Sequence, residues 1–218
     1  MTVYLISGLG ADYRVFQHLK FPDPVSVRHV VWIEPGKDET FASYCSRLSV
    51  QINASEEFAL IGVSFGGIIA TELAKSLNPQ ATIIISSVSR RQELPRYFKV
   101  IGKAGLHKLV PGWMYKRPNF YLFWLFGLVQ KQEKQLLRQI LKDSSAHFLK
   151  WAIDKILNWT NTERCINLLH IHGTKDRVFP VKKTQADIRI IDGGHFMVYN
   201  KADQIQPLLN SKLGCSKL

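Results

Sequence analysis

The sequence predicts an α/β fold in which a mostly parallel sheet of about six strands carries helices on both faces. Three observations predict it. Short apolar segments alternate with longer amphipathic ones over the first 87 residues, the same alternation returns near the C-terminal end, and 46% of the residues are hydrophobic. A strand, a helix and a second strand form a right-handed crossover, which makes neighbouring strands parallel and covers both sheet faces. A chain of 218 residues is long enough to bury one such core.

Six segments have the composition of buried strands, because each is a short apolar run. They are residues 2–7, 27–33, 58–64, 81–87, 166–173 and 186–192. Amphipathic spacing predicts helices over residues 13–20, 40–52, 66–77, 130–141 and 196–212. The segment between the last two strands is too short for a full helix.

Residues 88–160 interrupt this alternation and are predicted to form a helical insertion in a core made of residues 1–87 and 161–218. The insertion contains 14 Lys or Arg against 4 Asp or Glu, which accounts for most of the net charge of +12. A basic surface of this kind attracts an anionic substrate, an acidic partner or a membrane surface, although it is also compatible with a plain solvated helix face. Since no nucleic-acid recognition motif accompanies the charge, no nucleic-acid partner is expected.

The sequence shows no segment typical of export or membrane insertion. The first residues carry no basic leader, and the longest apolar run, residues 120–129, has half of the roughly 20 residues that a membrane-spanning helix needs. We therefore expect a cytoplasmic protein without a membrane span.

Cysteine and histidine spacing predicts neither a disulfide framework nor a metal site. Cys45, Cys165 and Cys215 are odd in number, widely separated and not part of a Cys-x-x-Cys pattern. His170 and His172 share one face of a predicted strand, but no third ligand with suitable spacing is visible. We expect inert thiols and structural histidines.

The segment Gly62-Val63-Ser64-Phe65-Gly66 lies where a predicted strand turns into a predicted helix. A nucleophilic serine on such a turn needs small neighbours, because the turn is very tight. The first N–H groups and the positive dipole end of the helix then point toward the reacting oxygen. The five-residue pattern alone is also compatible with an ordinary glycine-rich turn.

Asp176 and His195 supply the two groups that a serine nucleophile requires. A serine hydroxyl needs a base within hydrogen-bonding reach, and that base needs an orienting carboxylate. Each residue follows one of the last two predicted strands, and the C-terminal ends of parallel strands meet at one edge of a sheet. Taken singly, each is more typical of a cap or loop residue. Together with Ser64 they predict a catalytic triad.

Two other carboxylates compete with Asp176 for the acid position. Asp12 follows the first predicted strand, where we expect it to cap the next helix. Asp192 lies at the end of the last strand. Asp176 therefore remains the predicted acid.

Outside the insertion, nearly the whole chain resembles the α/β-hydrolase superfamily. The segments SGLG, GVSFG, HGTKD and GGH occur in the order of that family, with its Ser, Asp, His succession. The resemblance implies that Ser64 is the nucleophile, that His195 is the general base and then the acid, and that Asp176 orients the imidazole. It further implies an oxyanion hole made by the backbone N–H groups of Leu9 and Phe65, and a helical cap formed by residues 88–160.

The sequence departs from the family pattern in three places. Ser7 begins the oxyanion loop where many relatives have His in His-Gly-x-Gly, so its supporting hydrogen bonds are expected to differ. The chain starts at the strand before this loop, which implies about six strands in place of eight. The last two strands lack the usual helix between them. None of these departures removes a catalytic group.

The resemblance implies a cofactor-independent, metal-free serine hydrolase that works through an acyl-enzyme, with a carboxylesterase of small or medium esters as the default. A thioesterase or amidase with an anionic acyl substrate, a ligand-binding receptor, and a lyase or oxygenase are alternatives, because a fold does not fix a function. Phe196, Trp113 and Trp124 are predicted to contact the substrate, although aromatic residues with helical spacing also pack into cores. The sequence does not indicate an oligomeric state.

Overall fold

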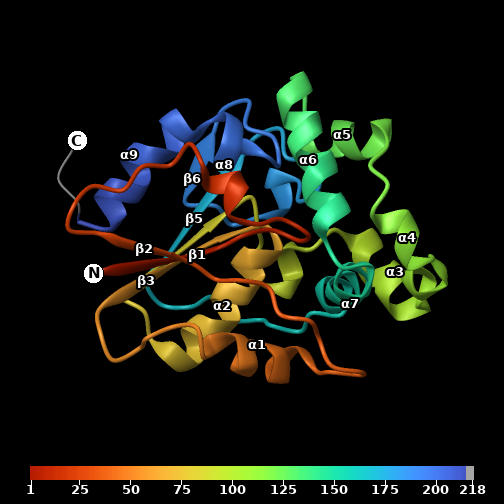
Figure 1. The fold of residues 1–218 in the computed structure, drawn as a ribbon, viewed down its shortest axis with the longest axis horizontal. Helices are drawn as coiled ribbons and strands as arrows, with labels where there is room; N and C mark the ends of the chain where they lie inside the picture. The colour runs from red at the N-terminus through yellow and green to blue at the C-terminus, as the bar shows by residue number, and fades with distance from the viewer. Residues whose placement is uncertain (215–218) are drawn as a thin grey trace.

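The computed structural model describes residues 1–214 and contains one sheet of six strands. The strands are β1 (Thr2–Ile6), β2 (Ser26–His29), β3 (Phe58–Val63), β4 (Ala81–Ile85), β5 (Leu168–Gly173) and β6 (Ile188–Ile190). They lie in the order β2-β1-β3-β4-β5-β6, and all neighbouring pairs are parallel (Figure 1). The predicted α/β architecture with a parallel sheet is confirmed.

The centre of the sheet is apolar on both faces. Every residue of β3 and β4 is buried, and Ile61 of β3 pairs with Leu5 of β1 and Ile83 of β4. These three side chains enter one apolar layer, whereas their neighbours Tyr4 and Leu60 enter the other. Because both faces are covered, the central strands are continuous apolar runs without polar alternation.

The second strand differs from its prediction as a buried strand over residues 27–33. β2 spans only Ser26–His29, and all four of its residues are exposed. It pairs with β1 alone and forms the edge of the sheet. Edge strands of native proteins are characteristically short and polar, which limits pairing with other chains. Val30, directly after the strand, is the buried residue of this segment.

Helices cover both faces of the sheet (Figure 1). One face carries α1 (Phe41–Ser49) and α2 (Phe65–Leu77), and the other carries a 3₁₀ turn η1 (Tyr13–Phe16), α8 (Met197–Asn200) and α9 (Ala202–Lys212). The helix predicted over 13–20 is reduced to η1, and the one predicted over 196–212 breaks near Lys201, whose φ of −132° is not helical. Only a 3₁₀ turn, η4 (Val181–Lys183), lies between β5 and β6.

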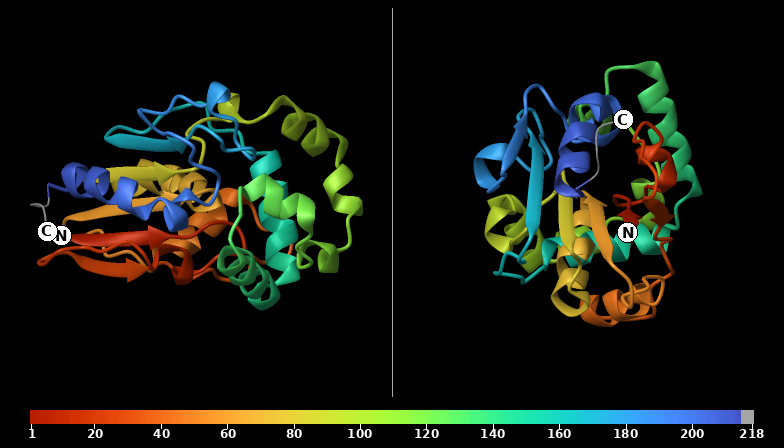
Figure 2. Two further views of the ribbon diagram at one scale, coloured as in Figure 1. Left: turned by 90° about the horizontal axis from the view of Figure 1, so that it is seen from above. Right: turned by 90° about the vertical axis from the view of Figure 1, so that its left-hand side faces the viewer.

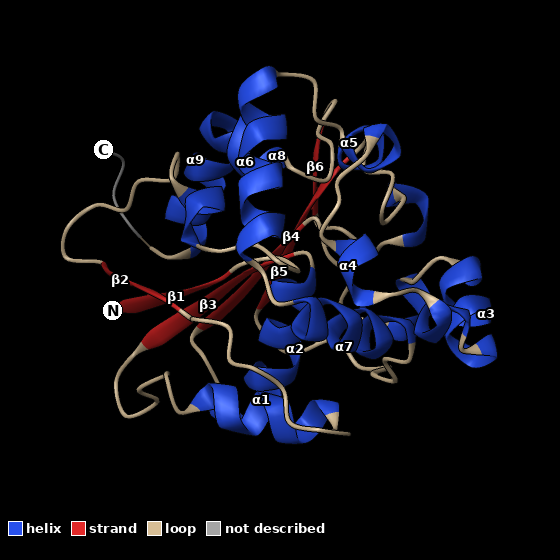
Figure 3. Ribbon diagram, turned by 45° about the vertical axis from the view of Figure 1, so that its right-hand side comes forward, coloured by secondary structure: helices blue, strands red, loops and turns tan. Residues whose placement is uncertain are grey.

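The segment between β4 and β5 is helical, as the sequence predicts. It contains η2 (Arg91–Glu93), α3 (Arg96–Ala104), η3 (Leu106–Leu109), α4 (Gly112–Tyr115), α5 (Phe120–Phe126), α6 (Lys131–Asp143) and α7 (Ala146–Leu157). Apolar side chains of α6 and α7 pack into the layers on opposite faces of the sheet. The shorter helices α3, α4 and α5 lie farther out, at the end of the molecule away from the N-terminus (Figures 2 and 3).

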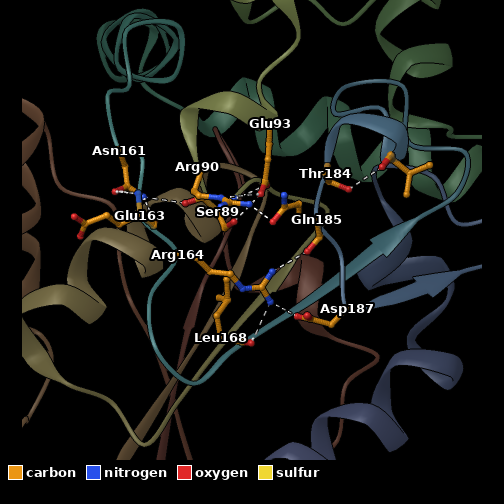
Figure 4. A network of polar contacts seen from close by, with 11 residues as sticks. Ser89, Arg90, Glu93, Asn161, Glu163, Arg164, Leu168, Thr184, Gln185 and Asp187 are labelled. Atoms are coloured by element: carbon orange, nitrogen blue, oxygen red, sulfur yellow. Dashed lines mark hydrogen bonds and ion pairs between the residues drawn. The ribbon is translucent and has the colours of Figure 1, made fainter.

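A polar network joins the two ends of this helical segment (Figure 4). The Asn161 side-chain amide donates to the Ser89 carbonyl at 2.9 Å, and the Arg91 N–H donates to the Asn161 carbonyl at 2.7 Å. The buried Glu93 carboxylate accepts from the backbone N–H and the hydroxyl of Ser89, at 2.9 and 2.8 Å. Hydrogen bonds therefore join the two ends of the helical segment to each other, between β4 and β5.

Within residues 1–214, no helix combines the length and the apolar character needed to cross a membrane. Cys45 and Cys165 are free thiols, and burial raises the pKa of Cys45 to about 12, which keeps it protonated and unreactive. Cys215 lies outside the described residues.

Replacing Gly62 by Ala is expected to lower the free energy of unfolding by about 2–3 kcal/mol, because the added methyl overpacks the crossing of β3 and α2. A Cβ at this position would lie 2.3 Å from the carbonyl oxygen of Gly66. Urea titration measures the effect. Gly36→Ala is the control, since a Cβ there meets nothing nearer than Glu39 at 3.7 Å. Equal losses in both variants would contradict the close approach.

Candidate active site

Ser64 occupies the turn between β3 and α2 in a strained backbone conformation. Its φ of 52° and ψ of −118° lie outside the regions that residues with a side chain commonly adopt. Such a conformation costs about 1–3 kcal/mol and persists only where the surroundings impose it. Here the Ser64 N–H donates to the Ile85 carbonyl at 3.0 Å, and the Ser87 hydroxyl donates to the Ser64 carbonyl at 2.6 Å. The side chain is thereby held at the C-terminal edge of the sheet.

The structure brings the three predicted triad residues into one hydrogen-bonded chain. His195 Nε2 lies 2.8 Å from Ser64 Oγ, and His195 Nδ1 lies 2.8 Å from Asp176 Oδ2. Because a carboxylate only accepts, Nδ1 carries the proton and Nε2 is free to accept the hydroxyl proton of Ser64. This is the arrangement of a serine nucleophile, a base and an orienting acid.

Asp176 is held in place and in its ionised form. Its side chain is fully buried, and its Oδ1 accepts the N–H groups of Val178 and Phe179, each at 2.9 Å. Burial alone would raise the pKa of Asp176, but the charge and hydrogen bond of His195 hold that pKa below its ordinary value. The carboxylate is therefore available to stabilise a protonated His195 imidazole.

Two aromatic rings surround the imidazole of His195, which is only 3% exposed. The ring centres of Phe126 and Phe179 lie 5.0 and 5.6 Å from that of His195, both edge to face. Phe179 belongs to the same loop as Asp176, and Phe126 ends α5. The imidazole is thus shielded from water by one residue of the sheet loops and one of the helical segment.

Leu9 and Phe65 place two free backbone donors beside Ser64. Phe65 is the first residue of α2, and Leu9 lies in the loop after β1. Among the hydrogen bonds formed within residues 1–214, none uses the N–H of either residue. The loop lies against the serine, because a Cβ on Gly8 would be 3.4 Å from Ser64 Cβ.

Ser7 supports this loop. Its hydroxyl donates to the Ala11 carbonyl at 2.7 Å, and the Trp32 indole N–H donates to the same carbonyl at 3.0 Å. The Ser144 hydroxyl, from the helical segment, donates to the Gly10 carbonyl at 2.8 Å. These three side-chain hydrogen bonds anchor the loop after β1.

An apolar cavity of about 530 Å³ opens on Ser64 and His195. Most of its wall comes from the helical segment, and none of the described residues that line it is Lys, Arg, Asp or Glu. The apolar lining consists of Leu9, Phe98, Ile101, Leu106, Val110, Leu122, Leu125, Phe126, Leu137, Leu141, Leu149, Ile153, Ile156, Leu157, Val178 and Phe179. A larger depression of about 1030 Å³ beside α9 is more open and lies away from Ser64.

The structure places two of the three predicted substrate contacts away from this cavity. Trp113 and Trp124 are 57% and 47% exposed, and neither lines the cavity at Ser64. The helical phase of α5 is the reason: Leu122 and Leu125 face the cavity, so Trp124 faces outward. Phe196 is buried and lines a small space of about 40 Å³ that adjoins Ser64.

Sequence reasoning missed the aliphatic cavity wall and a second imidazole in it. The Leu122, Leu125, Phe126 spacing is a helix face that could have been read from the sequence. His107 lines the cavity, and its Nε2 lies 2.8 Å from Asp154 Oδ1. Their pairing joins η3 to α7, which no sequence pattern indicates.

His170 and His172 form a buried pair behind Asp176. His172 Nε2 donates to the Phe179 carbonyl at 2.7 Å and lies 3.5 Å from Asp176 Oδ2, while its Nδ1 lies 3.1 Å from His170 Nε2. Burial lowers the pKa of both histidines, that of His170 to about 3. Both imidazoles are engaged with neighbours inside the protein. Residues 1–214 contain no group of three or more His, Cys, Asp or Glu placed to hold a metal ion.

The buried His170 predicts a loss of stability in mild acid. Below its ordinary pKa of 6.5 the unfolded chain binds a proton that the folded chain excludes down to about 3. The free energy of unfolding should therefore decrease as the pH is lowered below about 6.5, by about 1.4 kcal/mol per pH unit for this histidine alone. Urea titrations at about pH 7.5 and about pH 5 measure the slope. His170→Gln should lose less stability over this interval, and an unchanged slope in that variant would contradict the assignment.

Comparisons with known proteins identify the family and the fold. The sequence profile of the "Alpha/beta hydrolase family" matches residues 3–205. MenH from S. aureus superposes with a TM-score of 0.75 at 16% identity, covering 98% of this chain and 93% of that one. An esterase from Thermogutta terrifontis gives 0.70 at 15% identity, covering 98% and 89%. The esterase EaEST from Exiguobacterium antarcticum gives 0.68 at 18% identity, covering 97% and 91%.

No curated protein sequence matches this chain significantly. The structural matches, at these identities, show the fold. The family profile covers nearly the whole chain, and the predictions of an α/β-hydrolase fold and of an enzyme of the hydrolase class are confirmed. This protein belongs to the alpha/beta hydrolase family.

Proposed function

We propose that this protein is a serine carboxylesterase that cleaves esters with an apolar acyl group through an acyl-enzyme. One observation carries the proposal: the hydrogen-bonded chain from Ser64 through His195 to Asp176 opens on an apolar cavity. A nucleophile with an aligned base is available for acyl transfer, and the cavity offers a place for the acyl group.

In the proposed reaction, Ser64 Oγ attacks the ester carbonyl carbon while His195 Nε2 accepts its proton. The negative charge on the carbonyl oxygen is stabilised by the N–H groups of Phe65 and Leu9, where the loss of one such donor typically costs about 3 kcal/mol in the barrier. His195 then gives the proton to the departing alcohol. Water attacks the acyl-enzyme in the same way and releases the acid. Asp176 stabilises the imidazolium in both halves.

Residues 88–160 act as a cap in this proposal, while residues 1–87 and 161–218 form the catalytic core. The core supplies the nucleophile, the base, the acid and both backbone donors. The cap supplies most of the apolar cavity wall, from α3 through α7. Binding of the acyl group and the chemical step are thus assigned to different parts of the chain.

The cavity lining favours an uncharged, apolar acyl group over the anionic one considered from the sequence. Since none of the described lining residues is Lys or Arg, a buried carboxylate or phosphate would find no counter-charge there. Each methylene transferred into the cavity contributes about 0.8 kcal/mol. A thioester with the same acyl group fits this wall as well as an ester, and the test substrates distinguish the two.

A fluorophosphonate probe is expected to label the intact protein and to leave Ser64→Ala unlabelled. Ser64→Ala or His195→Ala should lower turnover of a p-nitrophenyl ester by about 10⁴- to 10⁶-fold, and Asp176→Asn by about 10⁴-fold. Ser55→Ala, at an exposed loop serine, is the matched control and should behave as the wild type. Folded wild type that resists the probe would indicate a ligand-binding role, and equal turnover by Ser64→Ala would refute the mechanism.

With p-nitrophenyl esters of increasing acyl length, kcat/KM is expected to rise by up to about fourfold per added methylene until the cavity is filled. Ile153 lines the cavity, so Ile153→Trp should shorten the preferred chain while retaining activity on the acetyl ester. Val50→Trp, at a position that is 85% exposed, is the control. A flat dependence on acyl length would argue against an acyl group bound in this cavity, as would an identical profile for Ile153→Trp. Matched thioesters run in parallel decide between ester and thioester.

A further inference from the structure

Exposed apolar side chains are concentrated on the outer helices of the segment between β4 and β5. Sixteen large apolar residues of the described chain are exposed, and ten of them lie between Tyr97 and Val129. On α5 three aromatic residues, Phe120, Tyr121 and Trp124, are 83%, 64% and 47% exposed and share one helical face. An accumulation of this kind marks an interaction surface, in contrast to isolated exposed residues.

The same part of the chain is positively charged and offers no exposed carboxylate. Residues 96–142 contain ten Lys or Arg and one acidic residue, Glu133. Glu133 is 3% exposed, and its Oε2 accepts the N–H groups of Val129 and Gln130 at 2.8 and 2.9 Å. Within residues 1–214, none of the ten cations forms an ion pair. This charge is therefore available to an external partner.

Aromatic and basic side chains meet directly in one groove of about 490 Å³ beside α5. Phe120, Trp124, Lys134 and Arg177 are among its lining residues. The Arg177 guanidinium lies 4.5 Å from the centre of the Trp124 ring and donates to the Trp124 carbonyl at 2.6 Å. Rings with one apolar and one polar side favour the headgroup level of a bilayer, and neighbouring cations favour anionic lipids.

The opposite face of α5 borders the apolar cavity that contains Ser64. Leu122, Leu125 and Phe126 line that cavity, whereas Phe120 and Trp124 face outward. In Figure 3, α3, α4 and α5 follow one another along the same side of the molecule. A partner bound to this side would lie one helix away from the proposed nucleophile.

We infer that the outer surface of α3, α4 and α5 binds the surface of an anionic lipid bilayer, with the α5 aromatics at the headgroup level. A second copy of the same surface is disfavoured as the occupant, because its unpaired positive charges would repel. An acidic protein partner would use the charge and the aromatic rings as well, and absence of vesicle binding would favour it over the bilayer. Binding to lipid is independent of the proposed hydrolysis. If both hold, ester substrates dissolved in the bilayer lie near the cavity.

Vesicle flotation of the Ser64→Ala protein tests the inference without turnover. We expect binding to phosphatidylcholine vesicles that contain about 30% phosphatidylglycerol, and at least about tenfold weaker binding to pure phosphatidylcholine vesicles. Raising the ionic strength from about 0.1 M to about 1 M shortens the Debye length from about 10 Å to about 3 Å and should release the protein. Absence of binding to both vesicles, or equal binding to both, overturns the inference.

Two variants locate the surface. The triple change Phe120→Ser, Tyr121→Ser and Trp124→Ser should weaken binding at least about tenfold, because buried apolar area drives insertion into the headgroup region. Arg117→Glu with Lys131→Glu should weaken it by a similar factor through charge alone. The control Val31→Ser, Val50→Ser and Ile166→Ser removes three side chains outside residues 96–142 that are together at least as exposed as the α5 aromatics.

The inference is overturned if the triple α5 variant binds vesicles as tightly as the control does. The inference is also overturned if the wild type is a dimer in solution and the α5 changes dissociate it. The surface would then be the interface between two copies of this chain. Because no product is measured, loss of vesicle binding leaves the proposed esterase chemistry intact. An inactive protein that binds vesicles would contradict the esterase and support this surface.

Discussion

The close crossing of three backbone segments at the end of β3 is the constraint on which the rest of the site depends. A Cβ at Gly66 would lie 2.2 Å from the carbonyl oxygens of Ile6 and Ser7, so α2 begins almost in contact with the end of β1. Only a residue without a side chain permits this approach. At this crossing Ser64 has a positive φ, and the loop that contains Leu9 lies against it. The proposed nucleophile and the two backbone donors proposed for it thus depend on one packing arrangement.

Polar and apolar functions are separated in this molecule. The loops after β3, β5 and β6 hold the hydrogen-bonded residues, and every polar contact of Asp176 comes from the sheet side of the cavity. The helices between β4 and β5 contribute mostly Leu, Ile and Phe to the wall. In a dry, weakly polarisable space, a fixed donor or carboxylate acts more strongly than it would in water. The apolar wall therefore strengthens the electrostatic interactions of the polar groups without hydrogen bonding to them.

Much of the fold and of the candidate site could be predicted from the sequence. Buried central strands such as β3 and β4 are continuous apolar runs, and the parallel arrangement brings Ser64, Asp176 and His195 to one edge. The exposed edge position of β2 could not be predicted, because it depends on which other strands pair with β2 in the folded sheet. Trp124 illustrates the same limit: which side of α5 faces the core depends on packing against α6 and the sheet. The His107 and Asp154 contact joins segments whose pairing leaves no local pattern.

The hydrogen bond between Ser89 and Asn161 affects how the sequence of the helical segment can vary. The bond between them closes a loop of 72 residues that begins and ends at one point of the sheet. The entropy of closing a flexible loop grows only with the logarithm of its length, so doubling the loop costs about 0.6 kcal/mol more. Helices beyond this point can therefore change in length at a small cost in closure entropy, while Asp176 and His195 stay on the loops that follow β5 and β6. The apolar cavity wall can thus vary in sequence separately from the hydrogen-bonded chain of Ser64, His195 and Asp176.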